Sequence, residues 1–219
     1  MQISNQRLTL DEARTLLASR QRNTTRIFKG LDSRYVARVT YYWYRYIVAV
    51  ERGGKLQGTG EVAACIRHAA DTLTGDSHKW GLMLMGGVGT GKTVLTRALQ
   101  KAVITLACRH LLPHEAGLRI IHAKDIHKAE GGSKAYATLC DEPMLAIDDL
   151  GDEPGEEMSY GTVTTPIADL LEYRYERQLL TIITTNISAQ KIRQKYGERI
   201  ADRCREMFEK ILFKNQSYR

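Results

Sequence analysis

Residues 86–93 combine several glycines with a final lysine and threonine, a pattern that suits the binding of phosphate groups. The eight residues are Gly86, Gly87, Val88, Gly89, Thr90, Gly91, Lys92 and Thr93. Glycines let the backbone curl so that its N–H groups face inward, and a following helix N-terminus adds partial positive charge. Lys92 would reach the β- and γ-phosphate oxygens, and the Thr93 hydroxyl would take a position on Mg²⁺. The pattern predicts a nucleotide site, and a plain glycine-rich turn is the alternative.

Polar side chains follow two later apolar runs. Asp148 and Asp149 come directly after the run at 144–147, and Asn186 comes after the run at 180–185. Near a phosphate loop, Asp148 would hold the metal, usually through a bound water, and Asp149 would orient or deprotonate the attacking water. Asn186 could hydrogen-bond the γ-phosphate or that water. The alternatives are a solvated loop for the acids and a helix N-cap for the asparagine.

Strands and helices that alternate along the chain must position these residues. Strands are predicted at 81–85, 118–122, 143–147, 180–185 and 211–213, and helices at 61–73, 93–112 and 162–178, with two more helical stretches around Lys191 and Ile200. A chain of 219 residues can bury one sizeable core. The alternation predicts an α/β fold with three layers around a mostly parallel five-stranded sheet.

Four segments resemble the successive motifs of the AAA+ ATPases, a class of P-loop NTPases. They read GGVGTGKT, LAIDDLG, TIITTN and YGERIADRCREMFEKILFKNQSYR. Over about residues 60–219 the chain is similar to the bacterial helicase-loader group (DnaC-type) and its transposition relative (IstB-type). The doubled aspartate, the run YRYER at 173–177 and the ending SYR narrow the resemblance to that group.

The resemblance implies a sensor role for Asn186 and an arginine finger at Arg203, with Arg199 as the second choice. A finger acts on the nucleotide of a neighbouring subunit, so a homo-oligomer is implied as well. A surface helix whose arginines form salt bridges with nearby acids is the alternative. Only fourteen residues follow Arg205, so we expect no C-terminal lid domain. With the short Asp149 side chain, this favours slow ATP hydrolysis that works as a switch.

The implied function is that of an ATP- and Mg²⁺-binding DNA replication protein. It would assemble under ATP control on a replicative helicase, on single-stranded DNA, or on both. Three alternatives stay open: a transposition helper that serves a transposase, a small-molecule P-loop kinase, and a module that binds ATP without cleaving it.

We expect residues 1–60 to form a basic, aromatic-rich helical segment ahead of an ATPase domain at 61–219. The segment holds eleven Lys or Arg against four Asp or Glu, while the remainder is balanced. Five of the eleven tyrosines fall within residues 35–46. Three interpretations are open: the rings stack on exposed bases, they anchor a protein partner, or they pack on the core. Packing would place Tyr35, Tyr42 and Tyr46 on one buried helix face.

Composition also bears on location and thiol chemistry. No stretch of about 18 uncharged apolar residues occurs, and the first residues lack the apolar core of a signal peptide, so we expect a cytoplasmic protein. The four cysteines form no C-x-x-C pair, which favours buried thiols over a zinc site or a disulfide framework.

Overall fold

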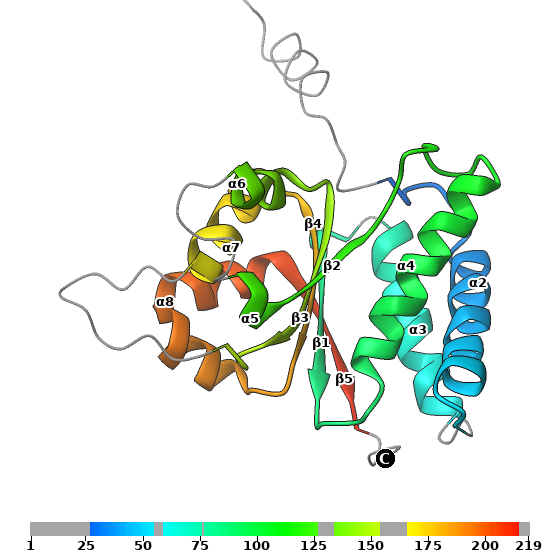
Figure 1. The fold of residues 1–219 in the computed structure, drawn as a ribbon, viewed down its shortest axis with the longest axis horizontal. Helices are drawn as coiled ribbons and strands as arrows, with labels where there is room; N and C mark the ends of the chain where they lie inside the picture. Colours follow the sequence, from blue (N-terminus) through cyan, green and yellow to red (C-terminus); the bar gives the residue numbers. More distant parts are fainter. Residues whose placement is uncertain (1–26, 55–58, 76, 127–133, 154–165, 215–219) are drawn as a thin grey trace, which may run out of the picture.

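The computed structural model describes residues 27–54, 59–75, 77–126, 134–153 and 166–214. Its centre is a five-stranded sheet in the order β2-β3-β4-β1-β5 (Figure 1). The strands are β1 (Gly81–Gly86), β2 (Arg119–His122), β3 (Met144–Leu150), β4 (Leu180–Thr185) and β5 (Phe208–Phe213). Every neighbouring pair is parallel, so the predicted sheet is confirmed and is parallel throughout.

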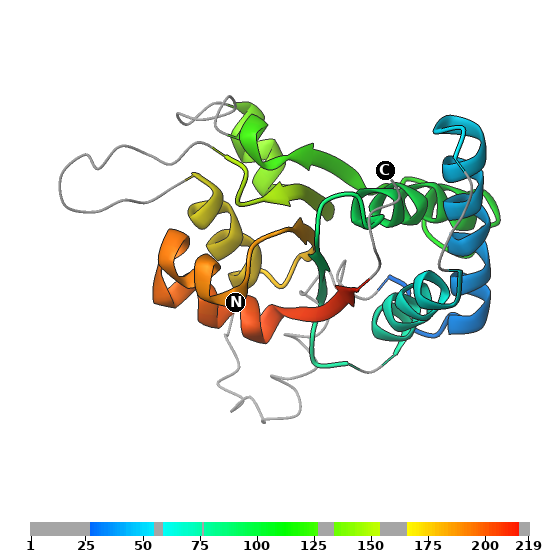
Figure 2. The same ribbon diagram turned by 90° about the horizontal axis from the view of Figure 1, so that it is seen from below.

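Helices cover both faces of the sheet (Figures 1 and 2). One face carries α2 (Ser33–Tyr46), its π-helical extension η2 (Ile47–Glu51), α3 (Thr59–Thr74) and α4 (Lys92–Cys108). The other carries α5 (Ala123–Ile126), α6 (Lys134–Asp141), α7 (Pro166–Glu176) and α8 (Ala189–Met207). Gly197, with φ of +87°, breaks α8 into the two helical stretches that were predicted. The three predicted layers are therefore present.

Two hydrophobic clusters fill the space between the layers, one on each face of the sheet. Leu82 and Leu84 of β1 point into the cluster formed with α2, α3 and α4, whereas Met83 points into the opposite cluster. All three side chains are buried. Successive side chains of a strand point to opposite faces, and a parallel sheet that is covered on both faces buries each of them. This is why the strands appear in the sequence as continuous apolar runs.

A buried arginine fixes the start of β4, the central strand. Arg174 of α7 is fully buried and donates hydrogen bonds to Thr181 Oγ1 and to the carbonyls of Leu180, Cys140 and Glu142. Burial lowers the pKa of the guanidinium to about 10, so it stays charged at neutral pH. Arg174 thus joins α6, α7 and β4, and it accounts for an arginine in the middle of the YRYER run.

Helix α2 belongs to the same hydrophobic core as β1 and α4, the two elements that flank the phosphate loop. Its buried side chains are those of Val36, Ala37, Thr40 and Tyr44, and they lie in the cluster with α3 and α4 or beside it. The predicted buried face is wrong, because Tyr42 is 64% exposed and Tyr46 is 39% exposed. Packing therefore uses a different face of α2, with Tyr44 fully buried and the other aromatic side chains of the helix half-buried or exposed. The domain division at residue 60 stays a prediction.

Three of the four cysteines, Cys65, Cys140 and Cys204, are buried as free thiols, and Cys108 at the end of α4 is exposed. Among the described helices, none has the length and apolar character that crossing a membrane requires.

Candidate nucleotide-binding site

The phosphate loop joins β1 to α4, as its sequence predicts. Gly89 and Gly91 have φ of +80° and +101°, in the left-handed region that favours glycine. Gly91 is the N-cap of α4, so the first free N–H groups of the helix face the loop. The Thr90 hydroxyl donates to the Gly87 carbonyl at 2.9 Å and braces the turn. The loop therefore offers backbone donors and a helix N-terminus to an anion.

Lys92 is nearly buried at the mouth of this loop. Its Nζ donates to the carbonyls of Gly86 (2.9 Å) and Gly87 (2.8 Å) and to Asn186 Oδ1 (2.6 Å). Burial lowers the pKa of the ammonium group, and the carboxylates of Asp149 and Asp148 oppose that shift. All three acceptors are neutral, so a phosphate oxygen would be a stronger partner for the same donor.

Asp148 lies across the mouth from Thr93. Its Oδ1 accepts from the Thr93 hydroxyl at 3.0 Å and from the Thr184 hydroxyl at 2.6 Å. Hydroxyl and carboxylate oxygens are ligands that suit Mg²⁺. The Thr93 and Asp148 oxygens lie side by side at the phosphate loop, so the residues present fit the predicted metal, which Asp148 would hold directly or through a bound water.

Asp149 owes its position to an irregularity in the sheet. The pairing of β3 with β4 shifts between Ile147 and Leu150, and Asp149 has φ of +55°. A bulge of this kind re-aims a side chain, and a non-glycine residue in this region carries backbone strain. The Asp149 N–H donates to Thr184 Oγ1 at 2.8 Å, and its Oδ2 lies 3.5 Å from His122 Nε2. Adjacent carboxylates thus point to different partners.

The pKa of Asp149 is raised above its usual value. Burial is the main cause and the neighbouring charge of Asp148 adds to it, while His122 and Lys92 act in the opposite direction. A higher pKa makes a carboxylate a better proton acceptor near neutral pH. The environment therefore suits a group that takes a proton from water.

The strand order explains why these residues meet. Strand β4 lies between β1, which leads into the phosphate loop, and β3, which carries the two aspartates. In parallel strands the carboxyl ends share one edge of the sheet. The predicted site residues Lys92, Thr93, Asp149 and Asn186 line one cavity of about 270 Å³ at that edge. Asp148 joins them through its hydrogen bond to Thr93.

Three residues that the sequence interpretation did not single out also belong to this region. Thr184 holds both aspartates, and His122 lies beside Asp149. Arg52, which directly follows η2, lines the cavity together with the phosphate loop. His122 and Thr184 lie at or near the carboxyl ends of their strands, and this position could have marked them as site residues from the sequence. No sequence signal places Arg52, because tertiary packing of η2 brings it there.

The two candidate arginine fingers lie on α8 and do not line this cavity. The side chain of Arg203 is 16% exposed, with Nη1 2.5 Å from Glu172 Oε1 and the guanidinium 5.0 Å from the Tyr175 ring. The side chain of Arg199 also pairs with Glu172 but is 69% exposed. Of the two, Arg199 is the more accessible to a neighbouring subunit.

No protein-family model and no curated protein sequence matches the chain. Three solved structures are similar in fold. The DnaC helicase loader has a TM-score of 0.54 and 24% identity, covering 78% of this chain and 98% of its own. DnaI has a TM-score of 0.53 and 22% identity, and the match covers 84% of this chain and 95% of DnaI. A primosome component from Streptococcus pyogenes serotype M3 has a TM-score of 0.52 and 22% identity, and the match covers 80% of this chain and 90% of that protein.

The chain shares the backbone fold of the DnaC helicase loader and of DnaI. This shared fold confirms, at the level of the backbone, the predicted resemblance to the helicase-loader group and the predicted P-loop NTPase architecture. The roles assigned to single residues stay predictions.

Proposed function

We propose that the chain is a Mg²⁺-dependent ATPase that assembles under ATP control on a replicative helicase, on single-stranded DNA, or on both. Hydrolysis would release the partner. The observation that carries this proposal is the meeting of Lys92, Thr93, Asp148, Asp149 and Asn186 at one edge of the sheet. The shared fold of the DnaC helicase loader supports a role in replication.

In this proposal each residue has a separate task. The loop amides and Lys92 bind the phosphates, and Thr93 and Asp148 hold Mg²⁺, which would neutralise charge on the phosphate oxygens. Asp149 accepts the proton of the attacking water. Asn186, whose Oδ1 is 2.6 Å from Lys92 Nζ, reports the presence of the γ-phosphate by giving up that contact.

An arginine from a neighbouring subunit would complete the site. Arg203 was the predicted finger, and Arg199 has the more exposed side chain. A guanidinium that donates to the γ-phosphate neutralises transition-state charge and links hydrolysis to assembly. Slow turnover in isolated protein and faster turnover in the assembled state would follow.

The test begins with titration calorimetry of purified protein with ATP, with and without Mg²⁺. We expect heat of binding that depends on Mg²⁺, and phosphate release that rises when single-stranded DNA or a replicative helicase is added. Asp149→Asn is the matched variant, which should bind ATP and release little phosphate. Absence of nucleotide binding would overturn the proposal. Transfer of phosphate to a metabolite would favour the kinase alternative, and hydrolysis already negligible before the substitution would favour a binding module.

A further inference from the structure

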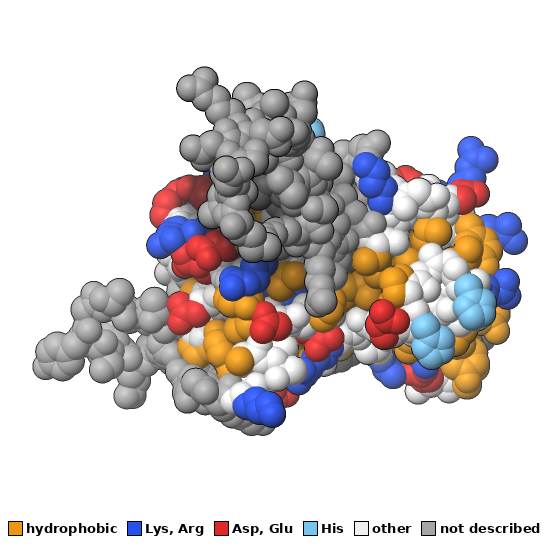
Figure 3. Space-filling model, turned by 90° about the horizontal axis from the view of Figure 1, so that it is seen from above, with side chains coloured by type: hydrophobic (Ala, Val, Ile, Leu, Met, Phe, Trp, Pro, Cys, Tyr) orange, Lys and Arg blue, Asp and Glu red, His pale blue; other side chains and the backbone are white. Residues whose placement is uncertain are grey.

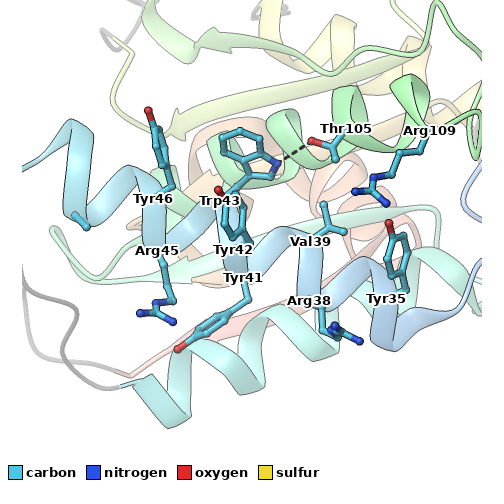
Figure 4. A pocket seen from close by; sticks show the side chains of 11 residues that line it. Tyr35, Arg38, Val39, Tyr41, Tyr42, Trp43, Arg45, Tyr46, Thr105 and Arg109 are labelled. Carbon is cyan, nitrogen blue, oxygen red and sulfur yellow. Dashed lines mark hydrogen bonds between the residues drawn. The ribbon is translucent and has the colours of Figure 1, made fainter.

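An open groove lies on the surface formed by α2 and α4, away from the nucleotide site. It has a volume of about 1040 Å³ and is lined by aromatic and arginine side chains, among them Tyr35, Tyr42, Trp43 and Tyr46 (Figure 4). Figure 3 shows this end of the molecule from above, where hydrophobic side chains lie at the surface among His, Lys, Arg and a few Asp or Glu side chains. Monomeric proteins seldom expose several large aromatic rings together without a function.

The rings form an ordered platform. Trp43 is held by a hydrogen bond from its Nε1 to Thr105 Oγ1 at 2.8 Å and by Lys101 Nζ, 5.4 Å from the ring centre. Tyr42 and Tyr46 meet Trp43 edge to face, with ring centres 5.3 and 5.5 Å away. Because the indole is fixed to α4, a ligand that stacks here would meet rings that are already positioned.

The charged side chains that line the groove are all positive. Arg38 and Arg45 of α2 and Arg109, which follows α4, line the groove, and no carboxylate does. Figure 4 shows Arg38 and Arg45 along one edge of α2, with Trp43 and Tyr46 directed to its α4 side. All three arginines are exposed, and their side chains make no hydrogen bond or ion pair within the described part of the chain. They are free to meet an external anion.

We propose that this groove, the α2 groove, binds single-stranded nucleic acid. Exposed bases stack on Tyr42, Trp43 and Tyr46, and the backbone phosphates lie against Arg38, Arg45 and Arg109. A duplex hides its base faces, so it could use the cations but not the rings. An acidic protein could meet the same cations, whereas a single strand repeats a flat base and a phosphate along its whole length and so engages the rings and the cations together. The biological use of the groove rests on the proposed function, whereas the binding itself does not.

The test uses the full-length chain and a fluorescein-labelled oligo(dT) strand, with binding followed by anisotropy at several salt concentrations. Each phosphate neutralised contributes about 0.7 to the slope of log K against log salt for single strands. The triple variant Arg38→Gln/Arg45→Gln/Arg109→Gln should lower that slope by about 2 and weaken binding at least tenfold. The matched control removes three exposed cations from α8, Lys191, Arg193 and Arg205, and should leave the affinity within about twofold.

A second pair of variants tests the rings. Tyr42→Ala should weaken binding roughly fivefold or more, and Tyr42→Phe, which keeps the ring, should bind as the unchanged protein does. Tyr42 is largely exposed, so neither change should unfold the chain. An effect of the α8 control equal to that of the groove variant would overturn the proposal. So would an unchanged affinity of Tyr42→Ala.

Competition separates the remaining outcomes. A duplex of equal length should compete at least tenfold less well than the single strand, and polyglutamate of equal charge should not reproduce the dependence on Tyr42. If polyglutamate does reproduce it, the groove is a site for acidic proteins and the inference fails. Calorimetry with ATP on the same samples keeps the two proposals apart, because normal ATP binding without DNA binding refutes the groove alone.

Discussion

Replacing Thr184 by valine tests how the site is held together. The Thr184 hydroxyl donates to Asp148 Oδ1 at 2.6 Å and accepts the Asp149 N–H at 2.8 Å, and the side chain is fully buried. Valine has nearly the same shape, so Thr184→Val removes both hydrogen bonds without opening a large cavity.

The expected cost follows from those two contacts. A hydrogen bond to a charged group contributes about 1.5 to 3 kcal/mol, and a buried N–H left without a partner costs about 1 to 3 kcal/mol. Asp148 retains its bond from Thr93, so the lower part of the combined range applies, about 3 kcal/mol. For a chain of this size that corresponds to a fall in Tm of about 6 to 12 °C.

Thermal unfolding without nucleotide measures this loss, with Thr184→Ser as the control that keeps the hydroxyl. Hydrolysis by Thr184→Val should fall at least tenfold, because the backbone of Asp149 loses its anchor, while ATP binding by the loop amides persists. A Tm within about 2 °C of the unchanged protein would refute the reasoning. So would hydrolysis at the normal rate.

Three further predictions concern the remaining site residues. Lys92→Ala should abolish ATP binding measured by calorimetry while leaving the circular dichroism spectrum unchanged. His122→Gln removes a group that lowers the pKa of Asp149, so that pKa should rise. Because hydrolysis needs the ionised carboxylate, the acidic limb of the pH–rate profile should move to higher pH. An acidic limb that does not move would exclude Asp149 as the base, or His122 as the group that lowers its pKa. Arg199→Ala and Arg203→Ala should both bind ATP, and the true finger is the one whose lost hydrolysis returns on mixing with Lys92→Ala. Arg203→Ala alone should also lower Tm, since its guanidinium is packed inside the chain.

The positions of the strands along the chain and of the phosphate loop followed from local sequence. Buried parallel strands need continuous apolar runs, and the glycines at 89 and 91 meet a backbone requirement that few other residues satisfy. The same logic placed Asn186 and the two aspartates at strand ends. These features depend on neighbours in the chain, so the sequence carries them directly.

Other features depend on contacts between distant segments and could not be predicted. The bulge at Asp148 and Asp149 arises from the pairing of β3 with β4, which lie over 30 residues apart. Arg199 and Arg203, four residues apart on α8, both pair with Glu172 of α7, but Arg203 also packs on the Tyr175 ring, which accounts for its lower exposure. On α2 nearly every position near residue 42 is aromatic, so periodicity alone gave the wrong buried face.

The short segment η2 touches both candidate sites. Ala49 lines the α2 groove, and Arg52, just beyond η2, lines the nucleotide cavity. Glu51 between them is tied to Arg97 and Lys101 of α4 by ion pairs at 2.6 and 3.3 Å. Ala49 and Arg52 are three positions apart, so one anchored turn links the linings of the two cavities. If occupancy of one cavity displaces this turn, thermodynamic reciprocity requires each ligand to change the affinity of the other by the same factor.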